Sequence, residues 1–136
     1  MGKNFEKYLK FHCDNGGTGK QFNFKFLEYK KGLLKLEAEF GSQTLNPNKT
    51  VQGGQMTSML DDATSLLLVY ESRGTIYPNS TNLNSLHHRP LFEGKVIVTA
   101  KMIQKGKNMA TIKGEIYNIE NKIATTLMHT VFLFKV

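Results

Sequence analysis

The segment 53–70 limits the possible folds more than any other part of the chain, because it has the pattern of a helix that is buried on nearly every side. Apolar residues recur along it at steps of three and four, at Met56, Met59, Leu60, Ala63, Leu66, Leu67 and Tyr70. Leu68 and Val69 lie off this stripe, so the second half of the helix is apolar almost all round. Such a helix is surrounded by protein, and the rest of the chain has to cover it.

The segments on both sides of this helix alternate apolar and polar residues, which is the period of a half-buried β-strand. Residues 22–26 and 34–40 flank Lys30, Lys31 and Gly32, and this arrangement predicts a β-hairpin. Four more such segments follow the helix, at 80–89, 95–104, 108–118 and 122–135. Because connections as short as those between them join antiparallel neighbours, these four segments predict a meander.

Within each of the last three segments, alternate residues share one face. These sets are Val96, Val98, Ala100 and Met102, then Ala110, Ile112, Gly114 and Ile116, then Ala124, Thr126, Met128, Thr130 and Phe132. Residues 3–12 add a short amphipathic helix at the start. The chain of 136 residues has room for one domain, residues 1–136. We therefore predict an α+β fold in which an antiparallel, six-stranded curved sheet wraps around one long central helix.

The net charge of +7, from 18 Lys and Arg against 11 Asp and Glu, indicates an anionic partner without identifying it. The lysines are scattered, and no zinc-ligand or helix-turn-helix pattern is present, so we expect no nucleic-acid partner. Apolar runs such as 66–70 are far shorter than the ~18 residues that indicate a membrane span. The start lacks a secretion signal and Cys13 is the single cysteine, which favours a cytoplasmic protein.

Histidines give no metal site in this sequence. His87 and His88 are adjacent on an expected strand, so their side chains point to opposite faces and cannot readily share an ion. His12 and Cys13 have no third group nearby in sequence to orient them for nucleophilic chemistry. We expect neither a metal nor a cofactor.

The glycine pair before the buried helix is the first feature suited to ligand binding or catalysis. Gly53 and Gly54 place free backbone N–H groups at the positive end of the helix dipole. Glycine also lets a ligand come within hydrogen-bond distance of the backbone. These residues can therefore bind a developing negative charge.

Asp61 is the second such feature, since it lies on the helix away from the apolar stripe. A carboxylate within a buried helix is costly unless it is paired or used. Asp62 lies about 100° further round, so the two acids cannot serve one site from one helix. Asp61 is either a functional acid or a hydrogen-bonded residue at a contact between subunits.

The chain resembles the hot-dog-fold acyl-CoA thioesterases of the phenylacetate-degradation and hydroxybenzoyl-CoA thioesterase type. The resemblance extends from about residue 30 to the end. Its residues are Asn46, Gln52-Gly53-Gly54, Met59-Leu60-Asp61-Asp62-Ala63, Ser80-Thr81-Asn82-Leu83, Arg89-Pro90, Gly94 and Gly106-Lys107. Many members of this family have histidine where this chain has Gln52. Glutamine can donate a hydrogen bond there but cannot carry a proton.

The resemblance implies a homodimer, and a dimer of dimers, in which each active site lies between the glycine turn of one subunit and the acid of the other. The N–H of Gly53 would polarise the thioester carbonyl, while Gln52 and Asn46 would orient the thioester or the turn. Asp61 of the partner subunit would act as general base or as nucleophile. Ser80 would help to hold the attacking water.

The resemblance also implies how the acyl-CoA substrate binds. Gly54 and Asn82 would contact the substrate, and Arg89, Lys105 and Lys107 would meet the phosphates or the pantetheine of CoA. The acyl chain would lie along the helix, where four residues are candidates for setting its length: Leu67, Tyr70, Tyr77 and Phe92. The function implied is hydrolysis of an acyl-CoA thioester to free acid and CoA. The alternative is a hot-dog protein that binds acyl-CoA or acyl-carrier protein without turnover.

Overall fold

A computed structural model describes residues 2–136, with side chains from residue 4 onward. Its elements follow in the order α1 (Gly2–Asp14), the 3-10 helix η1 (Gly19–Phe22), β1 (Lys25–Lys30), β2 (Leu33–Phe40), the 3-10 helix η2 (Ser42–Thr44), α2 (Gly53–Glu71), β3 (Ile76–His87), β4 (Gly94–Lys105), β5 (Met109–Tyr117) and β6 (Ile123–Lys135). In this part of the chain, no helix is both long and apolar enough to cross a membrane.

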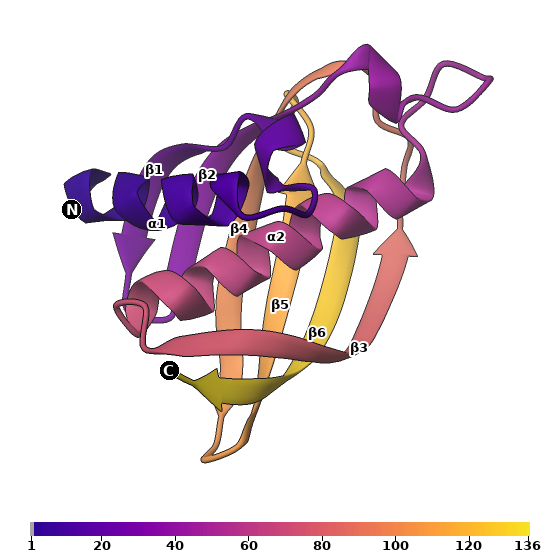
Figure 1. The fold of residues 1–136 in the computed structure, drawn as a ribbon. Coiled ribbons are helices and arrows are strands. Elements are labelled where there is room, and N and C mark those ends of the chain that lie inside the picture. Colours follow the sequence, from indigo (N-terminus) through magenta and orange to yellow (C-terminus); the bar gives the residue numbers. More distant parts are fainter. Residues whose placement is uncertain (1) are drawn as a thin grey trace.

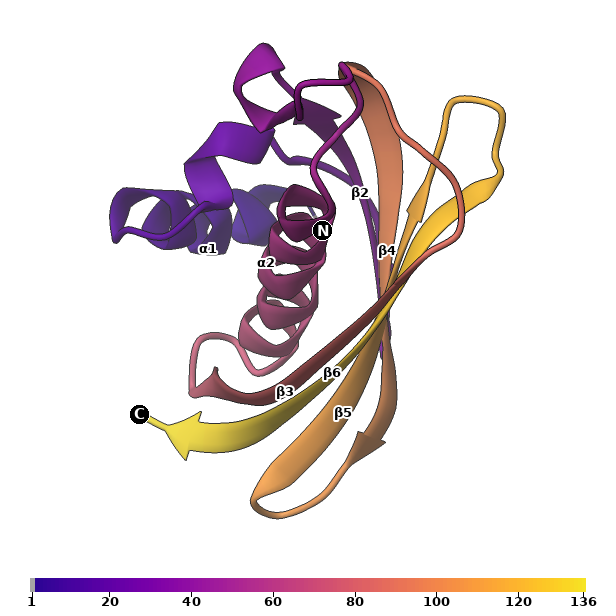
Figure 2. The ribbon, with the colours of Figure 1, turned by 90° about the vertical axis from the view of Figure 1, so that its right-hand side faces the viewer.

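The six strands form one antiparallel sheet in the order β1-β2-β4-β5-β6-β3. The sheet curves around α2, which lies against its concave face (Figures 1 and 2). This is the α+β arrangement that the sequence predicts, with one long helix held inside a curved sheet.

Helix α2 is covered on two sides, which explains why its second half is apolar all round. Four consecutive residues, Leu66 to Val69, are buried. The sheet covers one side of α2, and α1 packs against another, as Figure 2 shows. Phe5 of α1 is fully buried and its ring lies 5.5 Å from that of Tyr70 on α2. Burial of such aromatic rings supplies a large share of the apolar area removed from water.

Sheet and helix lie close together at Gly114 on β5. A Cβ atom at this position would lie 3.1 Å from Leu60 Cδ2 and 3.1 Å from Thr64 Cγ2. The absence of a side chain on Gly114 therefore lets the middle of α2 settle onto the sheet, and this contact fixes the height of Asp61 and Thr64 above the strands.

The predicted meander is wrong for its first strand. β3 pairs with β6 at the edge of the sheet, while β4 pairs with β2 and β5. Six residues, 88–93, connect β3 to β4, and an extended segment of that length spans about 20 Å. Crossing from β3 to β4 takes three strand spacings, about 14 Å, so the connection is long enough to pass the ends of β5 and β6.

Two strand boundaries also differ from the expected ones. Phe22 belongs to η1, and β1 begins only at Lys25. Asn23 separates the two with a left-handed backbone, φ 50°, which interrupts the extended chain. β3 begins at Ile76, four residues before the expected start. Both differences lie where turn residues, rather than apolar alternation, decide the local structure.

Candidate active site

The N-terminus of α2 presents backbone donors to its surroundings. Gln52 is the N-cap residue, with an extended backbone, and its side chain makes no capping hydrogen bond to the helix. The first N–H groups of a helix have no partner within it, so those of Gly53 and Gly54 point outward at the positive end of the dipole. A Cβ atom at Gly54 would meet nothing within 4 Å. Space for a ligand atom is therefore available at this end.

An imidazole lies beside Gly53, which the sequence did not predict. A Cβ atom at Gly53 would lie 3.2 Å from His87 Nε2. His87 Nδ1 is 3.2 Å from Thr125 Oγ1, while His88 Nε2 is 2.9 Å from Thr126 Oγ1. Since these two threonines are adjacent on β6, the histidines point to opposite faces, as predicted. Burial, and to a lesser extent His88, lowers the pKa of His87.

Asn46 holds the turn that leads into α2. Its Nδ2 donates to Thr50 Oγ1 at 2.8 Å, and its Oδ1 accepts hydrogen bonds from the backbone N–H groups of Asn48 and Thr50. Of the two roles considered for Asn46, these contacts favour orientation of the turn over direct contact with a substrate.

Asp61 and Asp62 have different surroundings, as the helical period predicts. Asp62 is buried under α1, where its Oδ1 lies 2.8 Å from His12 Nε2 and its Oδ2 accepts the Thr18 hydroxyl at 2.6 Å. The Asp61 side chain is 39% exposed on another side of α2. Burial raises the pKa of Asp61, Asp62 raises it further, and His12 acts in the opposite direction. A carboxylate with a raised pKa is a stronger base.

Ser80 and Asp61 are brought together by His129, a residue that the sequence analysis missed. His129 lies on β6 and is fully buried. Its Nε2 is 2.7 Å from Ser80 Oγ and 3.7 Å from Asp61 Oδ1, and its Nδ1 is 2.7 Å from Thr64 Oγ1. Burial lowers the pKa of His129 to about 4. The imidazole is therefore neutral near pH 7.

His129 was missed because the face predicted to be the apolar one on β6 is the wrong one. Leu127, His129, Val131 and Leu133 point into the core, together with Ala124, whereas Met128 and Phe132 are exposed. Apolar residues occupy both faces of this strand, so alternation alone does not choose between them. The sequence did contain a signal for its position. Leu127, Val131 and Leu133 are separated by even numbers of residues, so they lie on the same face of the strand as His129.

Within one chain, the glycine turn and the acid are separated. Asp61 follows Gly53 by eight helical residues, which corresponds to about 12 Å along the axis of α2. A thioester carbonyl bound at the Gly53 N–H is thus out of reach of Asp61 in the same chain.

A comparison with models of protein families matched that of the thioesterase superfamily to residues 48–125, which is more than half of the chain. The chain belongs to the thioesterase superfamily. It is therefore a thioester hydrolase by class. The matched span includes the glycine turn, Asp61 and Ser80. Among curated proteins, no significant relative was found.

Solved structures of thioesterases share the fold of this thioesterase over nearly its whole length. The PaaI protein of E. coli, from the phenylacetic acid degradation operon, has a TM-score of 0.82 at 18% identity, covering 98% of this chain and 96% of its own. A putative thioesterase from Ralstonia eutropha, a phenylacetic acid degradation-related protein, has a TM-score of 0.83 at 24% identity, with 95% and 98% covered. These similarities confirm the predicted hot-dog fold.

A third similar structure contains a ligand. It is a hypothetical thioesterase from Streptococcus pneumoniae with coenzyme A, and it has a TM-score of 0.80 at 13% identity. The match covers 95% of this chain and 96% of that one.

The expected CoA-binding residues of the thioesterase are spread over the sheet, and its basic members lie at two opposite ends. Arg89 follows β3 at the end where α2 begins, and Asn82 lies in the middle of β3, opposite Thr130. Lys105 ends β4 and Lys107 lies within the β4–β5 turn, which is at the other end of the sheet (Figures 1 and 2). One chain does not bring these two groups together.

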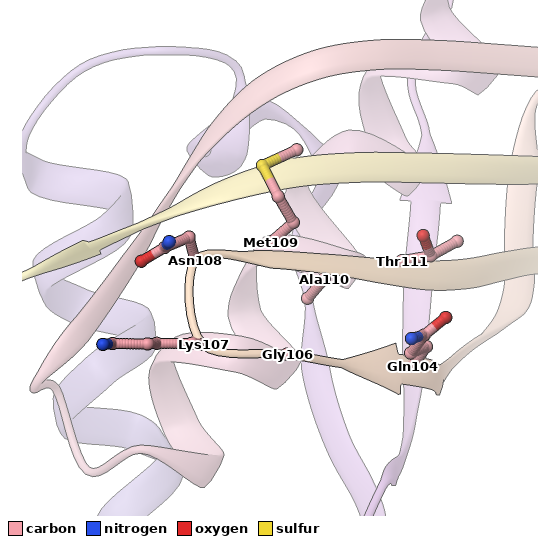
Figure 3. A pocket seen from close by; sticks show the side chains of 7 residues that line it. All are labelled: Gln104, Gly106, Lys107, Asn108, Met109, Ala110 and Thr111. Carbon is pink, nitrogen blue, oxygen red and sulfur yellow. The ribbon is translucent and has the colours of Figure 1, made fainter.

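A cavity of about 370 Å³ lies at the β4–β5 turn (Figure 3). Its lining includes Lys107, Asn108 and Thr111, whereas Lys105 is not part of it. In Figure 3, the side chains of Lys107 and Asn108 extend beyond the turn on the same side. A cationic and an amide donor next to each other suit an anionic or amide-containing ligand.

A second cavity, of about 240 Å³, lies between α1, α2 and the start of β3. Its walls include Ser65 and Val69 of α2, and Phe11 and Tyr77, whose ring centroids are 5.9 Å apart. Ser65 lies about one helical turn beyond Asp61. Of the four residues considered for the acyl chain, Tyr77 is the one that lines this cavity.

The other three residues have different positions. Leu67 is fully buried in the core, and Tyr70 packs among the rings of Phe5, Tyr8, Phe26 and Tyr29. Phe92 is 64% exposed on the β3–β4 connection.

Proposed function

We propose that the thioesterase hydrolyses an acyl-CoA to the free acid and CoA. The observation that carries this proposal is the convergence of Asp61 and Ser80 on one imidazole, with the raised pKa that suits Asp61 to remove a proton from water. Coenzyme A in the Streptococcus pneumoniae thioesterase supports the same class of thiol in this protein.

The active site is shared between two subunits of a homodimer. The separation of about 12 Å between Gly53 and Asp61 along α2 supports this arrangement, since a second chain can supply the missing half. β3 is an edge strand of 12 residues, and an unpaired strand edge is a template for pairing with a second chain.

A second pairing joins two dimers through the outer face of the sheet. Leu86, Met109, Met128 and Phe132 are exposed apolar residues of β3, β5 and β6. Met109 and Phe132 are directly paired across β5 and β6. Apolar side chains grouped in this way favour burial against another surface.

The reaction proceeds with the carbonyl oxygen at the Gly53 N–H, with Gly54 adjacent. Asp61 of the partner subunit removes a proton from water, and the water oxygen bonds to the carbonyl carbon. The C–S bond then breaks, and the thiolate leaves with the electron pair and takes up that proton. The other route, with Asp61 as nucleophile, forms an anhydride that water then hydrolyses. Removal of one oxyanion donor costs roughly 3–4 kcal/mol of transition-state stabilisation.

CoA binds through its anionic end to Arg89 of one subunit and to Lys105 and Lys107 of the other. The lining of the 370 Å³ cavity by Lys107 and Asn108 supports a role of the β4–β5 turn in this contact. The acyl group enters the 240 Å³ cavity, whose wall at Ser65 lies one turn beyond Asp61. Aromatic rings at Phe11 and Tyr77 limit its length.

Release of free thiol from a panel of short, long and aromatic acyl-CoAs tests the proposal. We expect wild-type protein to cleave at least one of them, and Asp61→Asn to lose about 10²- to 10⁴-fold in kcat. Asp14→Asn is a matched control, because Asp14 is an exposed acid that pairs with Lys10 on α1. Acyl-CoA binding without thiol release would support the non-catalytic alternative. Full activity of Asp61→Asn would show that Asp61 takes no part in catalysis.

A further inference from the structure

We propose that His129 is a positioning residue, which fixes the direction of the Ser80 hydroxyl so that Ser80 and Asp61 hold one attacking water between them. This inference rests on the proposed hydrolysis. It adds a residue that the resemblance does not provide, and it assigns a direction to each hydrogen bond around that residue.

The imidazole of His129 lies among apolar side chains and contacts two hydroxyl groups. His129 is fully buried on β6, opposite Ile112 on β5 and Leu83 on β3. One ring nitrogen contacts α2 through Thr64 Oγ1, and the other contacts β3 through Ser80 Oγ, both at 2.7 Å. The neighbouring inward positions on β6 are Leu127 and Val131. A polar ring among apolar neighbours costs free energy unless both nitrogens are paired, and both are paired here.

Because burial lowers the pKa of His129 to about 4, the ring is neutral near pH 7. A neutral imidazole has one N–H donor and one acceptor nitrogen. The ring therefore donates to one of its two hydroxyl partners and accepts from the other.

Thr64 decides which nitrogen carries the hydrogen. The Thr64 hydroxyl oxygen lies 2.7 Å from the Leu60 carbonyl oxygen, which can only accept. The Thr64 proton therefore goes to Leu60, and the hydroxyl oxygen must accept from His129. It follows that the hydrogen is on Nδ1, and that Nε2 carries a lone pair.

This position of the hydrogen determines the direction of the Ser80 hydroxyl. Since Nε2 can only accept, the Ser80 hydroxyl donates its proton to the imidazole. The lone pairs of Ser80 Oγ are then available to accept, as are those of the ionised Asp61 carboxylate. The distance of 3.7 Å between Nε2 and Asp61 Oδ1 is too long for a direct hydrogen bond, but it places the carboxylate beside this pair.

Two acceptors side by side orient a water molecule. The water donates one hydrogen to Ser80 and the other to Asp61, so that a lone pair on its oxygen is left for the carbonyl carbon. With the hydrogen on Nε2 instead, the Ser80 proton would turn toward Asp61 and compete with the water for the carboxylate. His129 therefore acts through Ser80, without contact to the reacting atoms.

The position of the hydrogen can be measured without turnover. In ¹⁵N NMR of the imidazole in wild-type protein near pH 7, we expect a protonated Nδ1 and an unprotonated Nε2. A hydrogen on Nε2, or a doubly protonated ring, would overturn the inference even if the protein hydrolyses acyl-CoA.

Two amide variants separate the two contacts kinetically. The shorter His129→Asn places its amide near Nδ1 and retains the contact with Thr64, whereas His129→Gln reaches the position of Nε2 and can accept from Ser80. We expect His129→Asn to lower kcat on the order of 10²-fold with little change in KM, and His129→Gln to stay within about tenfold of wild type. Equal losses in both variants, or a wild-type kcat in folded His129→Asn, would contradict the inference.

Combination with Ser80→Ala tests whether the effect passes through serine. We expect His129→Asn to cause little further loss in the Ser80→Ala background, since residues that act as one unit are not additive. Independent, multiplicative losses would indicate that His129 supports only the fold. If His129→Asn does not fold, Thr64→Val serves in its place, because it removes the acceptor for Nδ1–H and should lower kcat while KM is unchanged. Absence of thiol release by wild type would refute the proposed hydrolysis, independently of the NMR result.

Discussion

Asp61 and Asp62 are neighbouring acids on α2, and they have different roles because their burial and their hydrogen-bond partners differ. Both oxygens of Asp62 are engaged, by His12 and by Thr18, and these contacts attach α1 and η1 to the central helix. Asp61 lies beside the imidazole of His129, with its side chain 39% exposed. Asp62 is thus part of the scaffold, and Asp61 is free to meet a water molecule.

Replacement of Asp61 by asparagine is expected to raise the melting temperature at about pH 7. Folding raises the pKa of Asp61 above 3.8, chiefly through burial. The contribution of this carboxyl to stability is therefore present below its ordinary pKa and lost as the pH rises through the raised value. The difference between Asp61→Asn and wild type should shrink toward about pH 3. Thermal unfolding at both pH values measures it, and a lower melting temperature of Asp61→Asn at neutral pH would contradict the account.

Among the elements, α2 could be predicted from the sequence and two features of the strands could not. The period of Met56 to Tyr70 determines a buried helix, because few other structures place so many apolar residues at steps of three and four. The position of β3 beside β6 is a choice of partner, which local alternation does not encode. On β6, Leu127 and Val131 face the core while Met128 and Phe132 are exposed, so both faces of the strand carry apolar residues. For this reason His129 could not be placed from the period alone.

The contact between α2 and β5 is testable at Gly114. A Cβ atom there would be 3.1 Å from Leu60 Cδ2 and Thr64 Cγ2, both in the packed core. We expect Gly114→Ala to lower the free energy of unfolding by about 1–3 kcal/mol through overpacking. Urea unfolding measures this value, with Gly54→Ala as the control because its Cβ meets nothing within 4 Å. Equal stability of the two variants would show that the sheet can move away from the helix.

The start of α2 allows the oxyanion donor to be removed with little disturbance of the helix. Gly53 is the first helical residue, where proline is favoured, and Gln52 has the extended backbone, ψ 137°, that a following proline requires. A Cβ atom at Gly53 would lie 3.2 Å from His87 Nε2, so the exposed edge of this ring has to shift by a few tenths of an ångström. With that shift we expect Gly53→Pro to fold and to lose about 10²- to 10³-fold in kcat, because it lacks the N–H. Circular dichroism checks the fold and thiol release the rate. A folded Gly53→Pro with wild-type kcat would exclude this N–H as the donor.

For the whole molecule, the proposed mechanism requires a partner subunit. Gly53 and Asp61 are about 12 Å apart along one helix. The β4–β5 turn, which contains Lys107, lies at the opposite end of the sheet from the end of β3, which Arg89 follows (Figure 1). The residues proposed for each side of the site come from the sequence together with the family resemblance. The length of α2 between Gly53 and Asp61 supports their proposed distribution over two chains, in which a single chain contributes half of each site at two separate places.

Subunit mixing tests this central claim most directly. Asp61→Asn and Gly53→Pro are each expected to impair every site of their own homodimers, whereas a mixed dimer has one site with both residues intact. After unfolding and refolding of an equal mixture, half of the dimers are mixed, and we expect thiol release to recover to about a quarter of the wild-type rate. A mixture that stays as inactive as its two components would contradict a site shared between subunits.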